Sequence, residues 1–397
     1  MRKVVVELMT VTPLFLGGSD PRSGPPELRP PSFRGAMRYW YRAALGGVVG
    51  DDWKKVRQLE GKIFGITSDE EKEGRGSAVS VRVSLKRQIT SRDYVKERRQ
   101  PPSGKDYLFW SMAQTGSMQK GNYQPARKFI EEGFPFWLIL STQKFGSEAD
   151  FYLKQAIYSL WLTVHLGGIG SRSRRMAGSL SPVKPFELEG LTFGLKGNDV
   201  SAIANELSVN LRQIRQSLIK DFGQSSPASN KPGFDILSPV SSKVWVIGKY
   251  RTAMDALNDI GKKMRDFRNR REPDHREVAK WLSGSKTKIQ TVERVQFGLP
   301  IVYRYTNGPS GTIVAVVGGD DKIERRASPL WLSALRCPDG QIAVTAILFN
   351  SQFLPSNAYL AIDKKNYLGR TNPPGGLEIV EAWIKDQFPH RKEVNYA

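Results

Sequence analysis

The chain has 397 residues, with 60 Lys plus Arg against 39 Asp plus Glu and a formal net charge of +21. This length predicts more than one domain, and a hydrophobic content of 39% excludes a largely disordered chain. The longest strongly apolar stretch, FPFWLIL at 134–140, has the length of a strand, and the N-terminal stretch has no signal-peptide core. We therefore expect no membrane partner.

The net charge and the cysteine content further restrict the class of protein. The positive excess is spread along the chain, which attracts polyanions such as nucleic acids. A single cysteine, Cys337, excludes an intramolecular disulfide and a cysteine-cluster zinc site. We expect a cytoplasmic protein.

The first half of the chain alternates strands and helices. The pattern predicts strands near 1–13, 77–85 and 134–142. It predicts a helix over 32–46, with Ser32 as its N-cap, and a second helix over 149–166 that ends at Gly167-Gly168. Residues 67–77 and the turn at 102–106 are expected to be loops.

A comparable order of elements follows in the second half. The pattern predicts a helix over 205–222, a polar loop over 223–234, a strand over 241–250 and a helix over 253–270. A hairpin around Pro338-Asp339-Gly340 and a helix over 378–388 complete the set. The order predicts an α+β fold of two similar units, 1–190 and 191–397.

An arginine stripe is the most informative local pattern. Arg34, Arg38 and Arg42 recur every four residues and share one face of the 32–46 helix, while Trp40 lies on the apolar face. Because like charges at this spacing repel, an anion outside the helix would relieve them, and a polyphosphate backbone is the simplest candidate. The alternative is a solvated amphipathic helix.

A second candidate is the Gly/Arg loop, GGIGSRSRRMAG at 167–178. Gly168 and Gly170 allow the backbone to approach a ligand, and Arg172, Arg174 and Arg175 suit phosphate oxygens. The loop lacks a Walker A sequence, so nucleotide hydrolysis is not expected. The alternative is a flexible basic surface loop.

Aromatic residues accompany both basic segments. They either stack on bases or belong to the core, and they are Tyr39, Trp40, Tyr41, Tyr107, Phe109 and Trp110. The cationic run from Lys262 to Lys280 contains interspersed acids, so it reads mainly as a solvated helix face.

The sequence offers little for catalysis. The three histidines, His165, His275 and His390, lie far apart and lack metal-ligand spacing. His165 precedes the Gly/Arg loop, where a general acid/base role is conceivable, although a histidine at a helix C-terminus explains it better. Gly318-Gly319-Asp320-Asp321 fits a hairpin turn better than a metal site. We expect no metal, no cofactor and no enzymatic activity.

The chain resembles the RAMP superfamily of CRISPR-associated proteins, and within it the family of first subunits of the Cmr (type III-B) RNA-guided effector. The segments that carry this resemblance are TPLFLGG (12–18), ELRPPSFRGAMRYWYRA (27–43), GGIGSRSRR (167–175), FGLPIVY (297–303) and RRASPLWL (325–332). The family implies two tandem ferredoxin-like (RRM-like) domains and a non-catalytic subunit at the end of the complex that holds the 3′ part of the guide RNA. It implies other Cmr subunits as partners.

We therefore expect recognition of single-stranded guide or target RNA by electrostatic contacts and stacking. The expected contact residues are Arg29, Arg34, Arg38, Trp40, Arg42, Gly168, Gly170, Arg172, Arg174 and Arg175. One alternative is a metal-independent guide-processing endoribonuclease that uses His165 or a tyrosine. Another is a structural cap whose charge serves assembly.

Overall fold

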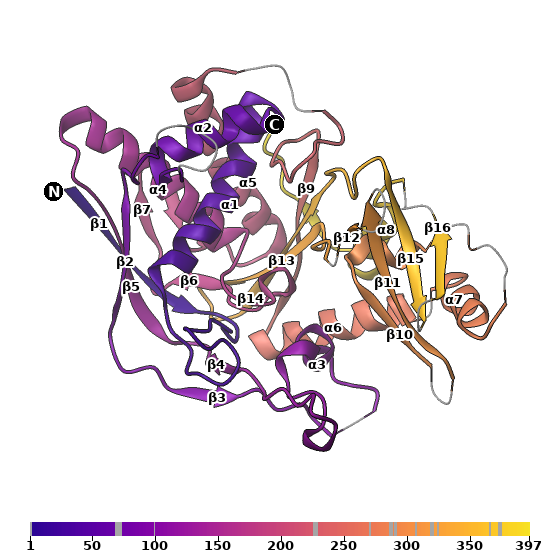
Figure 1. The fold of residues 1–397 in the computed structure, drawn as a ribbon. Helices are drawn as coiled ribbons and strands as arrows, with labels where there is room; N and C mark the ends of the chain where they lie inside the picture. The colour runs from indigo at the N-terminus through magenta and orange to yellow at the C-terminus, as the bar shows by residue number, and fades with distance from the viewer. Residues whose placement is uncertain are drawn as a thin grey trace.

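The computed structural model describes the chain apart from a set of short segments. These are residues 1, 68–73, 99, 225–228, 270, 286–288, 290–291, 306–307, 318–320, 324, 365–366 and 372–374. The described part is an α+β fold with several antiparallel sheets (Figure 1).

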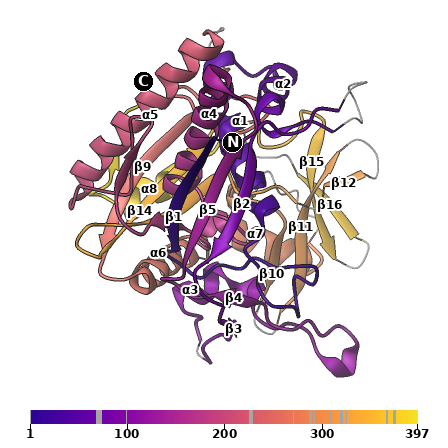
Figure 2. The same ribbon diagram turned by 90° about the vertical axis from the view of Figure 1, so that its left-hand side faces the viewer.

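The first half of the chain forms a four-stranded antiparallel sheet in the order β2–β5–β1–β6. Its strands are β1 (Arg2–Thr10), β2 (Ser80–Leu85), β5 (Pro135–Thr142) and β6 (Leu180–Pro182), and its helices are α1 (Pro30–Val49), α2 (Trp53–Phe64) and α4 (Gly146–His165). Val6 lies opposite Leu138 and both are buried, whereas Val5 is half exposed, because successive strand residues point to opposite faces. In Figure 2 these strands lie in front of α1 and α4, so the helices cover one face of the sheet.

The second half repeats this arrangement. Its sheet has the order β13–β14–β9–β17, so both sheets place their second, third, first and fourth strands side by side. Its elements are β9 (Ser242–Tyr250), α6 (Ala253–Asn269), β13 (Leu330–Arg336), β14 (Ile342–Phe349), α8 (Glu378–Gln387) and β17 (Lys392–Glu393). Helix α5 (Val200–Phe222) begins at the cap Asp199 and joins the halves.

A third sheet is inserted into the second half. It contains β10 (Ile301–Arg304), β11 (Ser310–Val317), β12 (Asp321–Ile323), β15 (Ala358–Lys364) and β16 (Tyr367–Thr371), next to α7 (Asp274–Leu282). The smaller elements are β3 (Ser91–Asp93), α3 (Gly104–Leu108), β4 (Lys128–Ile130), β7 (Phe186–Leu188) and β8 (Leu191–Phe193). In Figure 1 the third sheet lies to one side of the other two.

The second sheet is buried on both faces. Val244 and Ile347 belong to a core shared with α1, α4 and α5, whereas Trp245 and Leu332 belong to a core with α6 and α8. Every residue of β14 is buried, which explains why its sequence is a continuous apolar run rather than an alternating one. This packing joins the two halves through one sheet.

Most of the predicted elements are confirmed. The strands predicted near 1–13, 77–85, 134–142 and 241–250, the helices predicted over 149–166, 205–222, 253–270 and 378–388, and the hairpin around Pro338-Asp339-Gly340 correspond to observed elements within a few residues. Parts of the predicted loops at 67–77 and 223–234, and Gly318-Gly319-Asp320, lie outside the described residues.

Two local predictions are wrong, and one helix was missed. The N-cap of α1 is Arg29, not Ser32, because Pro30 and Pro31 occupy the first helical positions, where a missing N–H is not needed. Helix α2, capped by the Asp52 carboxylate, was not predicted. Residues 104–108 form a helix capped by the Ser103 hydroxyl instead of a turn.

Candidate nucleic-acid interface

The arginine stripe of α1 is partly neutralised within the protein. Arg38 and Arg42 form ion pairs with Glu60 of α2, whose side chain is only 1% exposed. The Arg42 Nη1 lies 3.1 Å from the Glu60 Oε2. Arg29 and Arg34 are exposed, and their side chains have no hydrogen bond or ion pair with another described residue. The anion that relieves repulsion between Arg38 and Arg42 is therefore a carboxylate of the chain itself.

Trp40 lies in the core. Its side chain is fully buried, and its ring centroid lies 5.1 Å from that of Trp331 and 5.9 Å from that of Phe349. Tyr41 is fully buried as well. These contacts make Trp40 an anchor of α1, the structural role that the sequence also allowed.

The glycines of the Gly/Arg loop let the loop pack against its own chain. Gly170 has φ +84°, and a Cβ placed there would lie 2.5 Å from the backbone oxygen of Phe15. A Cβ on Gly168 would lie 3.0 Å from the backbone oxygen of Gly178. The Ser171 N–H donates to the Phe15 carbonyl. The prediction that these glycines admit a ligand is replaced by a structural role, in which they fix the loop that carries the arginines.

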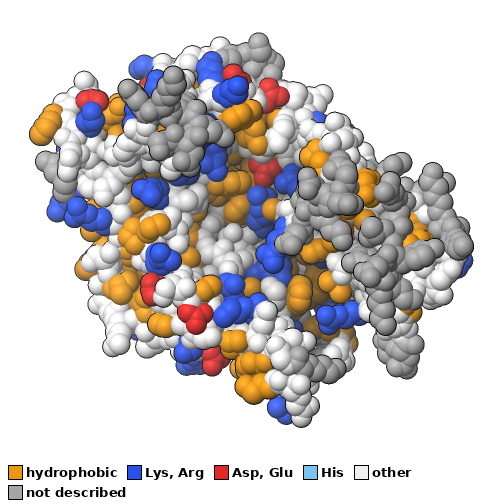
Figure 3. Space-filling model, viewed as in Figure 1, with side chains coloured by type: hydrophobic (Ala, Val, Ile, Leu, Met, Phe, Trp, Pro, Cys, Tyr) orange, Lys and Arg blue, Asp and Glu red, His pale blue; other side chains and the backbone are white. Residues whose placement is uncertain are grey.

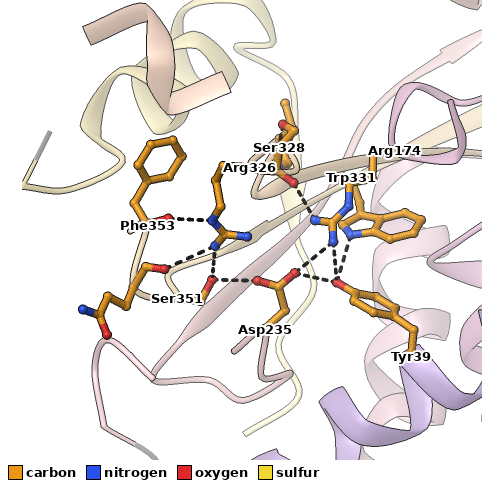
Figure 4. A network of polar contacts seen from close by, with 10 residues as sticks. Tyr39, Arg174, Asp235, Arg326, Ser328, Trp331, Ser351 and Phe353 are labelled. Atoms are coloured by element: carbon orange, nitrogen blue, oxygen red, sulfur yellow. Dashed lines mark hydrogen bonds and ion pairs between the residues drawn. The ribbon is translucent and has the colours of Figure 1, made fainter. Parts of the chain in front are cut away.

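Arg174 belongs to an internal polar network, shown in Figure 4. Its Nη2 donates to Asp235 Oδ2 at 3.1 Å, and its Nη1 donates to the Ser328 carbonyl. The guanidinium lies over the rings of Tyr39 and Trp331. Burial, followed by the nearby Asp235 carboxylate, raises the pKa of Tyr39, so its hydroxyl donates to Asp235. Arg174 therefore ties the loop to the second half of the chain.

Arg172 and Arg175 have neutral partners instead. Arg172 donates from Nε and Nη2 to the Ser111 hydroxyl, at 3.0 and 2.7 Å. Arg175 donates from Nη2 to the Phe297 carbonyl at 2.9 Å, and its buried Nη1 has no hydrogen-bond partner among the described residues. Neither has an ion pair with a carboxylate in the described part of the chain. An ion this well buried normally requires a partner of opposite charge.

Further arginines surround these two, and we call the set the arginine cluster. Its members interact with one another electrostatically, and they are Arg22, Arg127, Arg172, Arg175, Arg268 and Arg325. Arg127 donates to the Ser171 hydroxyl at 2.7 Å, and Arg268 donates to the Tyr107 hydroxyl at 2.8 Å. The Nε of each is buried and unpartnered within the described ranges. The cluster therefore presents several charged N–H donors and, among the described residues, no ion-paired carboxylate.

The environment lowers the pKa values of the Arg127, Arg172 and Arg175 guanidinium groups. Burial, followed by the neighbouring arginines, lowers the pKa of Arg172 to about 10 and that of Arg175 to about 9. Burial also lowers the pKa of Arg127. Both Arg172 and Arg175 remain charged at neutral pH, so a bound polyanion would offset an existing electrostatic cost.

A close approach of two glycines assembles the cluster from distant parts of the chain. A Cβ on Gly261 of α6 would lie 2.0 Å from the backbone oxygen of Gly104, so α3 and α6 touch through their backbones. This contact brings Tyr107 next to Arg268. Figure 3 shows Lys and Arg side chains gathered in a hollow at the centre of the face seen in Figure 1.

One aromatic side chain lies exposed at the edge of the cluster. Trp110 is 48% exposed, and the Arg172 guanidinium lies 5.5 Å from its ring centroid. Phe109 is buried and Tyr107 is half buried. Among the aromatic residues that the sequence suggested for base stacking, Trp110 has an open face beside the arginines.

Sequence reasoning missed four members of the cluster. Arg268 lies in the run from Lys262 to Lys280, where the interpretation as a solvated face is wrong because Met264 and Arg265 are buried and Arg268 is half buried. Arg325 lies in the segment RRASPLWL, which carried the family resemblance. No sequence signal marked Arg22 or Arg127.

His165 is buried in the core, a position that does not suit a general acid or base. Its Nδ1 donates to the Trp161 carbonyl at 2.9 Å, and its Nε2 accepts from the Gly194 N–H at 3.1 Å. Burial lowers its pKa to about 4, so the ring is neutral at pH 7. Within the described ranges, no group of three or more His, Cys, Asp or Glu is placed to hold a metal ion. None of the helices searched there is both long and apolar enough to cross a bilayer.

Comparisons with known proteins agree with the resemblance read from the sequence. Residues 7–181 match the model of the RAMP superfamily. The chain is 26% identical over 334 residues to the CRISPR system Cmr subunit Cmr1-1 of Pyrococcus furiosus, covering 83% of this chain and 82% of that protein. It is 32% identical over 200 residues to Cmr1-2 of the same organism, covering 45% of this chain and 95% of that protein.

Solved structures share the fold. The crystal structure of apo Cmr1 from Pyrococcus furiosus superposes with a TM-score of 0.62 at 21% identity, over 99% of both chains. A chain of a type III-B Cmr-beta complex bound to cognate target RNA superposes with a TM-score of 0.50 at 12% identity, over 96% of this chain and 98% of that chain. With nearly the whole of Cmr1-2 matched at 32% identity, the chain belongs to the Cmr1 family of CRISPR Cmr subunits, within the RAMP superfamily.

Proposed function

We propose that this protein is a non-catalytic, RNA-binding subunit of a cytoplasmic type III-B Cmr effector, with two tandem ferredoxin-like domains. It contacts single-stranded guide or target RNA near the 3′ end of the guide. The two sheets support the domain assignment, since both have the strand order expected of βαββαβ units. The absence of a paired cysteine supports the compartment.

The arginine cluster is the observation that carries the proposal. Arg172, Arg175 and Arg268 bond only to neutral oxygens, in contrast to the arginine stripe, where Glu60 supplies the counter-charge. Phosphate groups would supply several negative charges in a row, with geometry that guanidinium groups match. Trp110 adds a stacking face for a base beside Arg172. A chain in a related complex was solved with target RNA present, which supports RNA as the ligand.

Crosslinking within an assembled Cmr complex tests this function. Guide and target RNA are labelled separately, and the peptides that crosslink to each strand are mapped. The relevant peptides are those of residues 104–128, 167–178 and 262–269. We expect crosslinks in these segments, and we expect them to disappear in Arg172→Glu/Arg268→Glu. Crosslinks confined to residues 29–42 would instead make the arginine stripe the RNA site. A complex that assembles without any RNA crosslink to this subunit would favour the structural cap.

An endoribonuclease remains the second candidate because of one contact. The Tyr107 hydroxyl accepts a hydrogen bond from Arg268 inside the arginine cluster, where a scissile phosphate would bind. The buried position of His165 gives that residue no comparable support. Labelled repeat RNA incubated in EDTA should stay intact if the subunit is non-catalytic. Discrete cleavage that disappears in Tyr107→Phe would establish the enzyme.

A further inference from the structure

A pocket of about 640 Å³ lies between Tyr39 and Arg42 of α1 and residues 352–356. Phe234, Phe353 and Leu354 form an apolar wall, and Arg42, Arg326 and Asp235 bring charges to it. Its volume falls in the range of small-molecule sites, which combine apolar walls with a few placed polar groups. Of the polar residues that line the pocket, Tyr39, Asp235 and Arg326 are labelled in Figure 4.

The charges around this pocket leave positive donors free. Asp235 is fully engaged, since its Oδ1 accepts from Ser351 and its Oδ2 accepts from both Tyr39 and Arg174. Arg326 is fixed through Nε by the Phe353 carbonyl at 2.7 Å and through Nη2 by the Ser351 hydroxyl at 3.1 Å. In the described part of the chain, Nη1 of Arg326 has no hydrogen-bond partner. The pocket therefore contains the Asp235 carboxylate, whose charge is balanced by Arg174, and the Arg326 guanidinium. That guanidinium is held in place through Nε and Nη2, while its Nη1 is available to a ligand.

The pocket adjoins the arginine cluster along the chain. Arg325 belongs to the cluster and Arg326 lines the pocket, and Arg174 joins the Gly/Arg loop to Asp235 in its wall. A polyanion bound at the cluster would therefore lie beside residues that line the pocket. Unstacked bases bind proteins against aromatic side chains, while arginines hold their phosphates.

We propose that this pocket binds one unstacked nucleotide, with its base against Phe234 and Phe353 and its phosphate toward Arg326. For a nucleotide within a bound strand, the inference rests on the RNA-binding function proposed above. A free mononucleotide presents the same chemistry and is distinguished by the experiment.

Gly233 provides a way to fill the pocket without disturbing its walls. It lines the pocket, and a Cβ placed on it meets no atom within 4 Å. Gly233→Leu should occupy the space of the base. Gly76→Leu is the matched control, because a Cβ on Gly76 also meets no atom within 4 Å and Gly76 does not line the pocket.

The experiment uses the full chain and two probes. Single-stranded RNA carries 4-thiouridine at one position at a time, and photocrosslinks are mapped by mass spectrometry. We expect one position to crosslink to residues 233–235 or 351–356, and we expect this yield to fall at least tenfold in Gly233→Leu but not in Gly76→Leu. In parallel, AMP and UMP are titrated by calorimetry without RNA.

The outcomes separate this inference from the function on which it rests. A crosslink or a stoichiometric mononucleotide heat that depends on Gly233 supports the pocket, and the responding probe identifies the source of the nucleotide. Crosslinks to the arginine cluster without any Gly233-dependent signal overturn the pocket and leave RNA binding standing. If RNA does not bind at all, the proposed function fails and the mononucleotide titration alone decides the pocket.

Discussion

At the residue scale, Arg175 is a partly buried charge without an ion-paired carboxylate among the described residues. Its guanidinium is half buried against Phe297, and its Nη1 has no partner among the described residues. We predict that Arg175→Gln, which keeps a donor for the Phe297 carbonyl, raises the free energy of unfolding by about 1 kcal/mol because a desolvated charge is removed. RNA affinity should fall about tenfold, by about 1.4 kcal/mol.

Urea unfolding and fluorescence anisotropy measure these two effects. Arg336→Gln is the control, since Arg336 is exposed and has no ion pair with a described carboxylate. A loss of stability in Arg175→Gln without a loss of RNA affinity would make Arg175 a structural residue.

His165 predicts a pH dependence of stability. Its pKa falls from 6.5 to about 4 because the ring is buried, so the unfolded chain takes up a proton at a higher pH than the folded one. The contribution of neutral His165 to the free energy of unfolding is therefore fully present above pH 6.5. It should be lost as the pH falls toward 4, by about 3 kcal/mol in all. Urea unfolding at pH 7 and pH 4.5 should show a smaller difference in His165→Gln. An equal difference in both proteins would contradict the assignment.

Residue types in the sequence singled out the Gly/Arg loop but could not identify the partners of its side chains. Arg172, Arg174 and Arg175 were singled out together, yet Arg174 pairs with Asp235, which is 61 residues away. Arg38 and Arg42 likewise find Glu60 through the packing of α2 on α1. Such pairs depend on tertiary contacts between elements, so spacing along one helix or loop could not predict them.

At the element scale, the pairing of α1 with α2 explains the arginine stripe. Glu60 is buried under Arg38 and Arg42, which are 29% and 41% exposed. We predict that Glu60→Gln lowers the free energy of unfolding by about 1–2 kcal/mol, a reduced figure because both arginines are partly solvated. RNA affinity should stay the same or increase, because two cations are released.

Thermal unfolding and anisotropy check this prediction on the same preparation. A marked fall in RNA affinity in Glu60→Gln would show that Glu60 positions Arg38 and Arg42 for RNA, which would return the stripe to the interface.

The regular elements were predictable where a local pattern was strong. Helix α4 and strand β5 have clear periodicity, and the β13–β14 hairpin has a turn sequence. The third sheet was not predicted, because β10, β12 and β16 are short and are joined by chain segments distant in sequence. Its position, and the contact of α3 with α6, decide where Arg268 and Arg325 lie, so these two of the six cluster members could not be predicted.

At the scale of the whole molecule, the two halves and the insertion converge on one basic surface. The Gly/Arg loop comes from the first half, Arg268 from α6 of the second, and Arg325 from the segment before β13. A net charge of +21 attracts RNA in general, but general attraction does not distinguish one arginine from another. The central claim is that the arginine cluster makes the direct phosphate contacts.

The salt dependence of RNA binding tests that claim most directly. The logarithm of the binding constant for a single-stranded RNA should be measured against the logarithm of salt concentration, for the wild type, Arg172→Gln/Arg175→Gln/Arg268→Gln and Arg212→Gln/Arg251→Gln/Arg336→Gln. Both triple variants lose the same charge, but the second removes exposed arginines outside the cluster. We predict that the cluster variant has a slope shallower by about 2, because each lost phosphate contact lowers the slope by about 0.7. The control variant should keep a slope near that of the wild type. Equal slopes in the wild type and the cluster variant would contradict the central claim.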